Sequence, residues 1–321
     1  MEEYFKLVWS TILLRPYVFI FLITFIFIAY QFFGWRRTII FTLTAWVIAF
    51  LSEYSSITNG FPYGDYQYTY LTQLKDGEVW KVGEKELFLF GVVPFIDSLS
   101  YTFLSFIGYA LSVYVFSPLI KLKNAIIPAD TYSIRYSFRV AFLGALIITF
   151  MDVIIDPVAT LGSKWFLGEI HRYTHPGYYF GIPLTNYLGW FFTSFLILFL
   201  FQRVDSFLSA KDFFSGKRNS LYPHKLLLLT LLYLGVVGFN LVVTVLIGEY
   251  HMAISGFLIQ TPILIFLLIP VFQKHSVASE EEILAHLRDF PCAELEKSLA
   301  QRVIPTKNNG TSLGNELLSE D

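Results

Sequence analysis

The chain has 321 residues, of which 55% are hydrophobic and only 15% are charged. Water-soluble domains usually contain about 25% charged residues, so this composition excludes an ordinary globular protein. The net charge of −2 and the single cysteine exclude a basic nucleic-acid surface, an internal disulfide and a cysteine-based metal or redox centre. The remaining class is an all-α, polytopic integral membrane protein.

Seven apolar stretches are long enough to cross a membrane as helices. A hydrocarbon core of about 30 Å requires roughly 20 mostly apolar helical residues, and lipid cannot satisfy open backbone groups. The predicted spans are residues 16–33, 38–54, 95–117, 137–156, 187–203, 224–248 and 252–272. We therefore predict a bundle of about seven transmembrane helices, within a range of six to eight.

The apolar run 87–117 makes this number uncertain. As one continuous helix it would be about 46 Å long. Pro94 favours a break, which leaves residues 87–93 as an entering or interfacial piece. If that piece crossed the membrane instead, the side on which the C-terminus lies would change.

Lysine and arginine residues in the connections predict the orientation. One side of the bundle carries seven of them and the other side, which includes the C-terminal tail, carries sixteen. The tail is therefore predicted to be cytoplasmic, with the long loops 55–94 and 157–186 facing outward. We expect a transmembrane domain over residues 1–273 and a soluble tail over 274–321.

The tail begins with a helix signal. Ser279 and Glu282 have the spacing of a capping box, which predicts an amphipathic helix through about residue 303. Residues 306–321 have the composition of a flexible end.

Two aspartates in the fourth span are the first candidate site. Asp152 and Asp156 are four residues apart, so they share one helix face, and Pro157 is expected to end or kink the helix just after them. Burial and mutual repulsion favour one protonated carboxyl group beside one ionised group, which is suited to proton delivery. The alternative is an interfacial pair hydrated among lipid headgroups.

A second cluster follows the second span. Glu53 lies at the outward end of that span, and the following loop contains Tyr63, Tyr66 and Tyr68 among strong turn signals. Such a loop can line an apolar pocket with hydroxyl groups. The alternative is an aromatic belt at the membrane interface.

A third cluster contains His171, His175 and Asn186. The HxxxH spacing occurs in the histidine boxes of membrane desaturases, but those enzymes need several boxes, and Pro176 argues against a helix here. The role of the two histidines is left open. Asn186 begins the fifth span, where its amide either points into a pocket or caps the helix.

The motifs together resemble the membrane carotenoid biosynthesis proteins, which include carotenoid 1,2-hydratases and bisanhydrobacterioruberin hydratases. The similarity spans roughly residues 38–270, and its most specific part is Met-Asp-Val-Ile-Ile-Asp-Pro at 151–157. Two departures are Tyr101, where the family has a Trp, and Asp97 in a normally apolar stretch. The other matching positions are Glu53, Gly60, Pro62-Tyr63-Gly64, Tyr66, Tyr68, Pro94, Trp165, Gly181, Pro183, Asn186 and Gly189-Trp190.

The resemblance implies a cofactor-independent hydratase with no metal, which adds water to the terminal 1,2 double bond of an acyclic or monocyclic carotenoid dissolved in lipid. We hypothesise that protonated Asp152 delivers the proton, and that Asp156 or Glu53 stabilises the carbocation and accepts a proton from water. The expected substrate-binding residues are Tyr63, Tyr66, Tyr68, Trp165, Asn186 and Trp190.

Two other functions are considered. The DxxxD spacing also occurs in intramembrane prenyltransferases, which bind a diphosphate through magnesium, although a second aspartate-rich motif is absent from this sequence. A non-enzymatic carrier of carotenoid or lipid is the third hypothesis, with the carboxylates coupling transport to protons.

Overall fold

The computed structural model describes residues 2–69, 71–73, 79–81, 86–122, 125–168, 170–214, 224–272, 277–292 and 295–296. Its elements are α1 (Glu2–Leu14), α2 (Pro16–Asn59), β1 (Tyr66–Tyr68), β2 (Leu71–Gln73), β3 (Val79–Lys81), β4 (Phe88–Leu89), β5 (Val93–Pro94), α3 (Phe95–Phe116), β6 (Leu119–Leu122), β7 (Ala125–Pro128), α4 (Tyr132–Arg135), α5 (Phe138–Thr160), the 3₁₀ turn η2 (Gly162–Lys164), β8 (His171–Tyr173), α6 (Leu184–Ala210), α7 (Lys225–Leu246), α8 (Tyr250–Phe272) and α9 (Glu280–Asp289).

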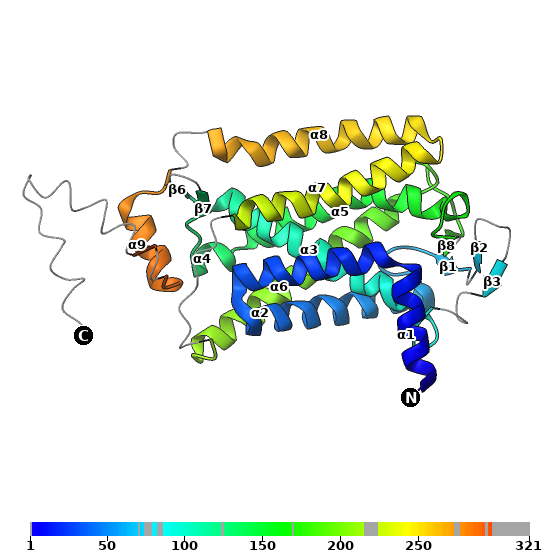
Figure 1. Ribbon diagram of the computed structural model, residues 1–321, viewed down its shortest axis with the longest axis horizontal. Coiled ribbons are helices and arrows are strands. Elements are labelled where there is room, and N and C mark those ends of the chain that lie inside the picture. Colours follow the sequence, from blue (N-terminus) through cyan, green and yellow to red (C-terminus); the bar gives the residue numbers. More distant parts are fainter. Residues whose placement is uncertain are drawn as a thin grey trace, which may run out of the picture.

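The predicted all-α membrane bundle is confirmed. Seven helical segments of the described chain are long and apolar enough to cross a membrane. They are Pro16–Phe33, Trp35–Asn59, Phe95–Phe116, Phe138–Thr160, Leu184–Ala210, Lys225–Leu246 and Tyr250–Pro270. Their axes run roughly along the long direction of the molecule in Figure 1, whereas α1 lies across one end of the bundle.

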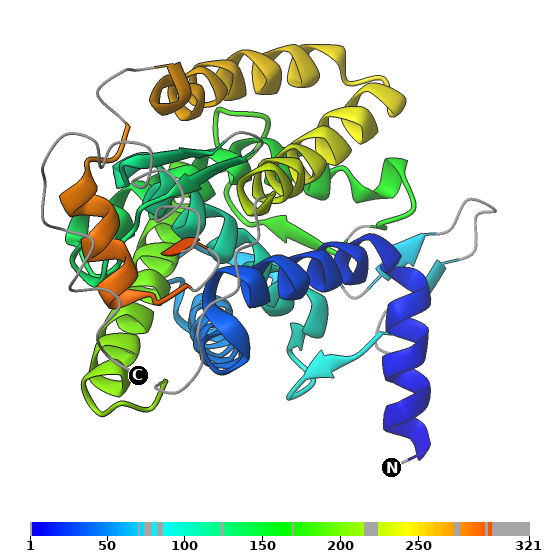
Figure 2. The ribbon, with the colours of Figure 1, turned by 60° about the vertical axis from the view of Figure 1, so that its left-hand side comes forward.

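Helix α2 contains two of these spans, which form a hairpin. The break lies at Gly34, whose φ of 72° and ψ of 170° are non-helical. A positive φ is accessible to glycine at little cost because it has no Cβ. The two halves therefore lie side by side and run in opposite directions (Figures 1 and 2).

Helix α3 is the centre of the bundle. In its most apolar window 83% of the residues are buried, compared with 28% in α8. It passes very close to α5, because a Cβ added to Gly108 would lie 2.6 Å from the carbonyl oxygen of Gly144. Small residues at a crossing allow helices in a membrane to approach in this way.

We expected Pro157 to end or kink its helix. The helix does not end there, because α5 continues to Thr160. Proline removes one hydrogen bond of the i to i−4 type, and only three residues of helix follow it, so few bonds are affected. The hydroxyl of Thr160 donates to the carbonyl of Pro157 over 3.0 Å and holds this last turn. Asp156 therefore lies inside the helix.

One end of the bundle, which we call the loop end, carries α1, β1–β5 and β8. The strands form short antiparallel pairs, including β4 with β5 and β1 with β8. Residues 87–93 thus form a small hairpin rather than another span, and α3 begins at Phe95 directly after Pro94. The predicted break at Pro94 is confirmed, whereas the position of residues 87–93 relative to the membrane stays a prediction.

A buried ion pair joins the segments of the loop end. Arg15, between α1 and α2, donates from Nε and Nη2 to the two carboxylate oxygens of Glu86 over 3.1 and 2.9 Å. Its Nη1 donates to the carbonyl of Leu167 over 2.6 Å. Removing one partner of a buried pair typically costs about 3–5 kcal/mol, so this contact holds three distant segments together.

The opposite end, the tail end, carries the β6–β7 hairpin, α4 and α9. The capping box of Ser279 and Glu282 is present. Helix α9 ends at Asp289, earlier than the predicted residue 303, because Pro291 disfavours a helical conformation of the residue before it. Residues 293–294 and 297–321, on which the rest of that prediction falls, lie outside the described residues. The orientation and the division at residue 273 stay predictions.

Candidate functional site

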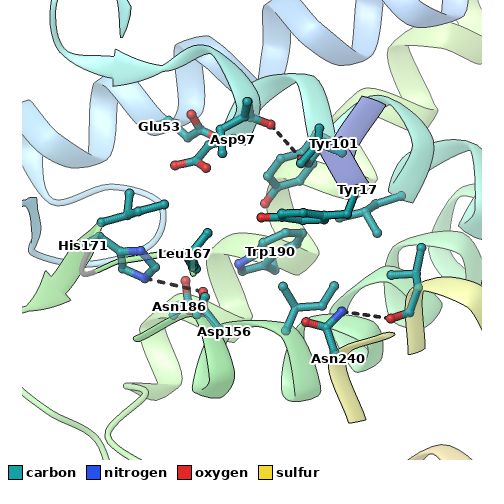
Figure 3. Close-up of a pocket in the computed structure, with 18 of the residues that line it drawn as sticks. Tyr17, Glu53, Asp97, Tyr101, Asp156, Leu167, His171, Asn186, Trp190 and Asn240 are labelled. Atoms are coloured by element: carbon teal, nitrogen blue, oxygen red, sulfur yellow. Dashed lines mark hydrogen bonds and ion pairs between the residues drawn. The ribbon is translucent and has the colours of Figure 1, made fainter. Parts of the chain in front are cut away.

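The described part of the chain encloses a cavity among the helices, near the loop end. Its volume is about 170 Å³, and most of the exposed surface inside it is apolar. The walls come from α2, α3, α5, α6 and α7 together with β1 and β8. Figure 3 shows the polar side chains that face the cavity.

Two carboxyl groups lie on one wall. Glu53 comes from α2 and Asp97 from the first turn of α3, and the two side chains are neighbours in Figure 3. Glu53 is buried, and its Oε2 has no hydrogen-bond partner among the described residues. A buried carboxyl group without donors is more stable when it carries its proton.

The third carboxyl group faces the cavity from the opposite wall. Asp156 of α5 accepts a hydrogen bond from the amide of Asn186 at 2.7 Å and another from the hydroxyl of Tyr173. His171 lies beside it, with 3.6 Å between Nε2 and Oδ1. Several donors around one carboxylate stabilise its ionised form, so the two walls offer carboxyl groups in different settings.

Asp152 lies behind this wall. Its side chain is fully buried, and its Oδ2 accepts a second hydrogen bond from the amide of Asn186 at 2.9 Å. Asn186 therefore connects the two aspartates, and the residue at the cap position of α6 is Pro183 instead. Asp156 lines the cavity, whereas Asp152 reaches it only through Asn186.

A short ribbon positions the groups next to Asp156. Strands β1 and β8 pair in antiparallel register, with Tyr66 opposite Tyr173 and Tyr68 opposite His171. The ring of His171 packs edge-to-face against those of Tyr66, Tyr68 and Tyr173, with centroid distances of 6.0, 6.4 and 5.7 Å. Pairing of two loops about a hundred residues apart thus completes the site.

An aromatic group forms the next part of the wall. The hydroxyl groups of Tyr63 and Tyr101 are 2.6 Å apart, and Tyr101 stacks on Trp190 with 4.3 Å between ring centroids. The loop holding Tyr63 packs tightly on α6 at Gly189, where an added Cβ would lie 2.6 Å from Cδ1 of Tyr63. Tyr101, a departure from the family pattern, is therefore a contact residue of the cavity.

The loop tyrosines keep their protons. Burial raises the pKa of Tyr63, Tyr66, Tyr68 and Tyr173 well above the usual value, and nearby carboxyl groups add to the effect. These phenols are neutral at physiological pH, so they supply hydrogen-bond donors and apolar ring faces to the cavity.

Most of the predicted residues meet here, although they come from distant parts of the chain. The cavity is lined by Glu53, Tyr63, Tyr66, Tyr68, Asp156, Trp165, Asn186 and Trp190. The second histidine, His175, is exposed on the loop. The lining also includes Tyr17, Asn240, Tyr173 and His171, which the sequence did not single out as site residues. Only the HxxxH spacing drew attention to one of them.

A diiron centre is not supported by the geometry of the described residues. Among them, no group of three or more His, Cys, Asp or Glu side chains is arranged to hold a metal ion. His171 and His175 also lie on a strand and a loop rather than on a helix, as expected from Pro176.

Comparison with known proteins identifies the family. No curated protein and no solved structure matches the chain. The profile of the carotenoid biosynthesis proteins matches residues 14–262, which is well over half of the chain and includes the whole cavity. The match gives this integral membrane protein a role in carotenoid biosynthesis and a carotenoid as substrate. The chain therefore belongs to the carotenoid biosynthesis protein family.

Proposed function

We propose that this protein is a hydro-lyase that adds water to the terminal 1,2 double bond of an acyclic carotenoid end. The observation that carries the proposal is the placement of carboxyl groups on two opposite walls of a cavity between membrane helices (Figure 3). A carotenoid reaches such a cavity from the lipid, and addition of water to an alkene requires an acid and a base but no change of oxidation state.

The size and lining of the cavity favour a reaction at the end of the polyene. Pockets that enclose a drug-sized ligand are typically about 300–1,000 Å³, whereas this cavity is about 170 Å³. It can hold the end group, while the rest of the chain stays in lipid. Part of its wall is purely hydrocarbon, contributed by Val18, Phe21, Phe103, Leu104 and Val236.

Glu53 is the proton donor in this proposal. Its buried, unpartnered oxygen favours the neutral carboxylic acid, and Asp97 beside it disfavours a second negative charge on the same wall. The proton is transferred to the less substituted alkene carbon, C-2. The electron pair of the double bond forms the new C–H bond, and a tertiary cation develops at C-1.

Asp156 is the carboxylate that faces this cation. Donors from Asn186 and Tyr173 orient it and favour its ionised form, and in this form it stabilises positive charge in the transition state without reorganising. The oxygen of a water molecule attacks C-1, and Asp156 accepts the proton that this water loses. The ring of Trp190 can add cation–π stabilisation of about 2 kcal/mol when desolvated.

This assignment differs from the initial hypothesis about Asp152. That residue is enclosed by protein, and its link to the cavity runs through the amide of Asn186. We therefore assign Asp152 to orienting Asn186, and through it Asp156. The role of proton donor passes to Glu53, because Glu53 lines the cavity and its Oε2 accepts no hydrogen bond from the described residues.

The test is expression in a bacterium that accumulates lycopene or γ-carotene, followed by mass analysis of the pigments in normal and isotope-labelled water. We expect a product heavier by one water, with its oxygen from the labelled solvent. Glu53→Gln and Asp156→Asn should each abolish it, whereas Asp152→Asn should reduce it. Glu249→Gln is the matched control, because Glu249 pairs with Lys164 away from the cavity.

Two results would contradict the hydratase. Magnesium-dependent release of pyrophosphate would identify a prenyl or diphosphate enzyme, although no Lys or Arg is among the described residues that line the cavity to balance a diphosphate. Carotenoid bound and recovered unchanged by the wild-type protein would identify a carrier.

A further inference from the structure

His171 has a position that the proposed reaction leaves unexplained. Its ring lines the cavity beside Asp156, with Nε2 3.6 Å from Oδ1, while its backbone belongs to β8 at the loop end. Its side chain is 14% exposed, compared with 9% for that of Asp156. It is thus a titratable side chain in the wall between the reacting carboxylate and the end of the bundle.

The reaction cycle requires a path for protons at this position. After water has been added, Asp156 holds one proton and Glu53 has lost one, so neither group is ready for the next substrate. Direct transfer across the cavity has to pass through the space that holds an apolar end group. A route to the aqueous phase at each wall restores both groups with no net change in protons.

We propose that His171 is the relay that carries the proton from Asp156 to the aqueous phase at the loop end. In this step the O–H bond of the Asp156 carboxyl group breaks, the imidazole accepts the proton at Nε2, and water at the loop end then takes up a proton from the ring. Glu53 regains its proton from water after product leaves. The inference rests on the proposed function.

The groups around His171 support proton transfer between its ring and Asp156. The groups that face its ring are Asp156 from α5, Tyr66 and Tyr68 from β1, and Tyr173 from its own strand. The three phenols have raised pKa values because they are buried, so they stay neutral. Among these groups, Asp156 is therefore the one that the proposed reaction protonates, and it is the partner of His171 in the relay.

The strand pairing fixes the ring next to Asp156. Residues 171–173 pair with Tyr66–Tyr68, and the backbone N–H of Thr69 donates to the carbonyl of Ile170 over 2.7 Å. The pairing thus holds the ring 3.6 Å from Asp156, just beyond hydrogen-bond distance. Proton transfer requires a contact of about 2.6–3.2 Å or one bridging water, so this gap has to close or hold a water in the relay step. His175, four residues later, is exposed outside the strand and serves as the matched control.

The experiment measures turnover and its pH profile for the wild type, His171→Gln, His171→Phe and His175→Gln in proteoliposomes loaded with lycopene. His171→Phe keeps the aromatic packing and His171→Gln keeps a hydrogen-bond donor, but neither side chain titrates. We expect both variants to lose at least ~10-fold in turnover, with added imidazole restoring part of the loss. His175→Gln should match the wild type.

The outcomes separate the two proposals. Turnover by His171→Gln equal to that of the wild type, or a loss that imidazole does not restore and that leaves the pH profile unchanged, would overturn the relay. If the wild-type protein forms no hydrated product, the proposed function fails instead. Thermal melting of each variant in detergent shows whether a loss of turnover is due to misfolding. If one His171 variant misfolds, the other variant provides the test of the relay.

Discussion

At the level of single residues, the carboxyl groups of the cavity differ in their hydrogen-bond donors. Asp156 receives donors from Asn186 and Tyr173, whereas Oε2 of Glu53 has none among the described residues. Because donors stabilise the charged form and burial opposes it, two residues of the same chemical type take opposite roles. This contrast depends on the neighbours and not on the carboxyl groups themselves.

Asn186 is the residue on which this contrast depends most. We predict that Asn186→Leu leaves both aspartates without their shared donor, which destabilises the fold by about 1–3 kcal/mol and lowers formation of hydrated product at least tenfold. Melting temperature and pigment analysis measure the two effects. Asn59→Leu, at an exposed helix end, is the control. Full activity of Asn186→Leu would show that Asp156 does not need the amide.

At the level of elements, the site depends on the close approach of the 62–63 loop to α6. Gly189 allows it, since a Cβ at that position would meet Cδ1 of Tyr63 at 2.6 Å and the carbonyl oxygen of Pro62 at 2.7 Å. The contact places Tyr63 against Tyr101, and so shapes one wall of the cavity. Gly189 thus allows the packing that positions Tyr63 and Tyr101.

Two glycine substitutions test this contact. Gly189→Ala should push the loop away from α6, lower the melting temperature and reduce product formation several-fold. Gly238→Ala in α7 is the matched control, because no atom lies within 4 Å of an added Cβ there. Replacing a helical glycine at such a position typically stabilises by about 0.4–1 kcal/mol. Equal behaviour of the two variants would contradict the packing argument.

At the level of the whole molecule, α9 connects the tail to the bundle. His286 donates from Nδ1 to the carbonyl of Asp130 over 2.6 Å, and the carboxylate of Asp289 accepts from the backbone N–H of Tyr132 over 2.8 Å. Burial lowers the pKa of His286 and outweighs the opposing effect of Asp130, and the charges of Lys225 and Arg135 add smaller contributions in the same direction as burial. The docked histidine is therefore neutral.

This contact predicts a dependence on pH. A released His286 takes up a proton near pH 6.5, whereas the docked residue does so only at lower pH, so docking weakens as the pH falls below about 6.5. Burial alone would raise the pKa of Asp130, but the positive charges of Arg135 and Lys225 lower it, so this carboxylate stays charged throughout. Hydrogen exchange of residues 280–289, corrected for the intrinsic exchange rate at each pH, should therefore show a smaller protection factor at pH 5.5 than at pH 7.5.

Two variants check which histidine is responsible. His286→Asn keeps a hydrogen-bond donor but does not titrate, so the protection factor of α9 in this variant should be the same at both pH values. His251→Asn, at the loop end, should behave as the wild type. If α9 of the wild-type protein has the same protection factor at the two pH values, the neutral docked histidine is refuted.

Much of the architecture was predictable because it depends on local composition. Long apolar runs must form helices in lipid, so all seven spans were predicted. Most of their ends were correct to within four residues. The capping box at Ser279 was likewise predictable, because its partners are three residues apart. Extension of α5 past Pro157 was not, because proline disfavours but does not forbid a final helical turn.

The candidate site was also predictable only where it depends on local composition. Residue types that are costly in a membrane, such as Glu53, Asp152 and Asp156, are conspicuous in any apolar sequence. Which of them faces the cavity follows from contacts between segments far apart in the chain: Asn186 between the two aspartates, and strand β8 beside β1. Local pattern carries no information about such long-range contacts, since they arise only when the helices and loops pack together.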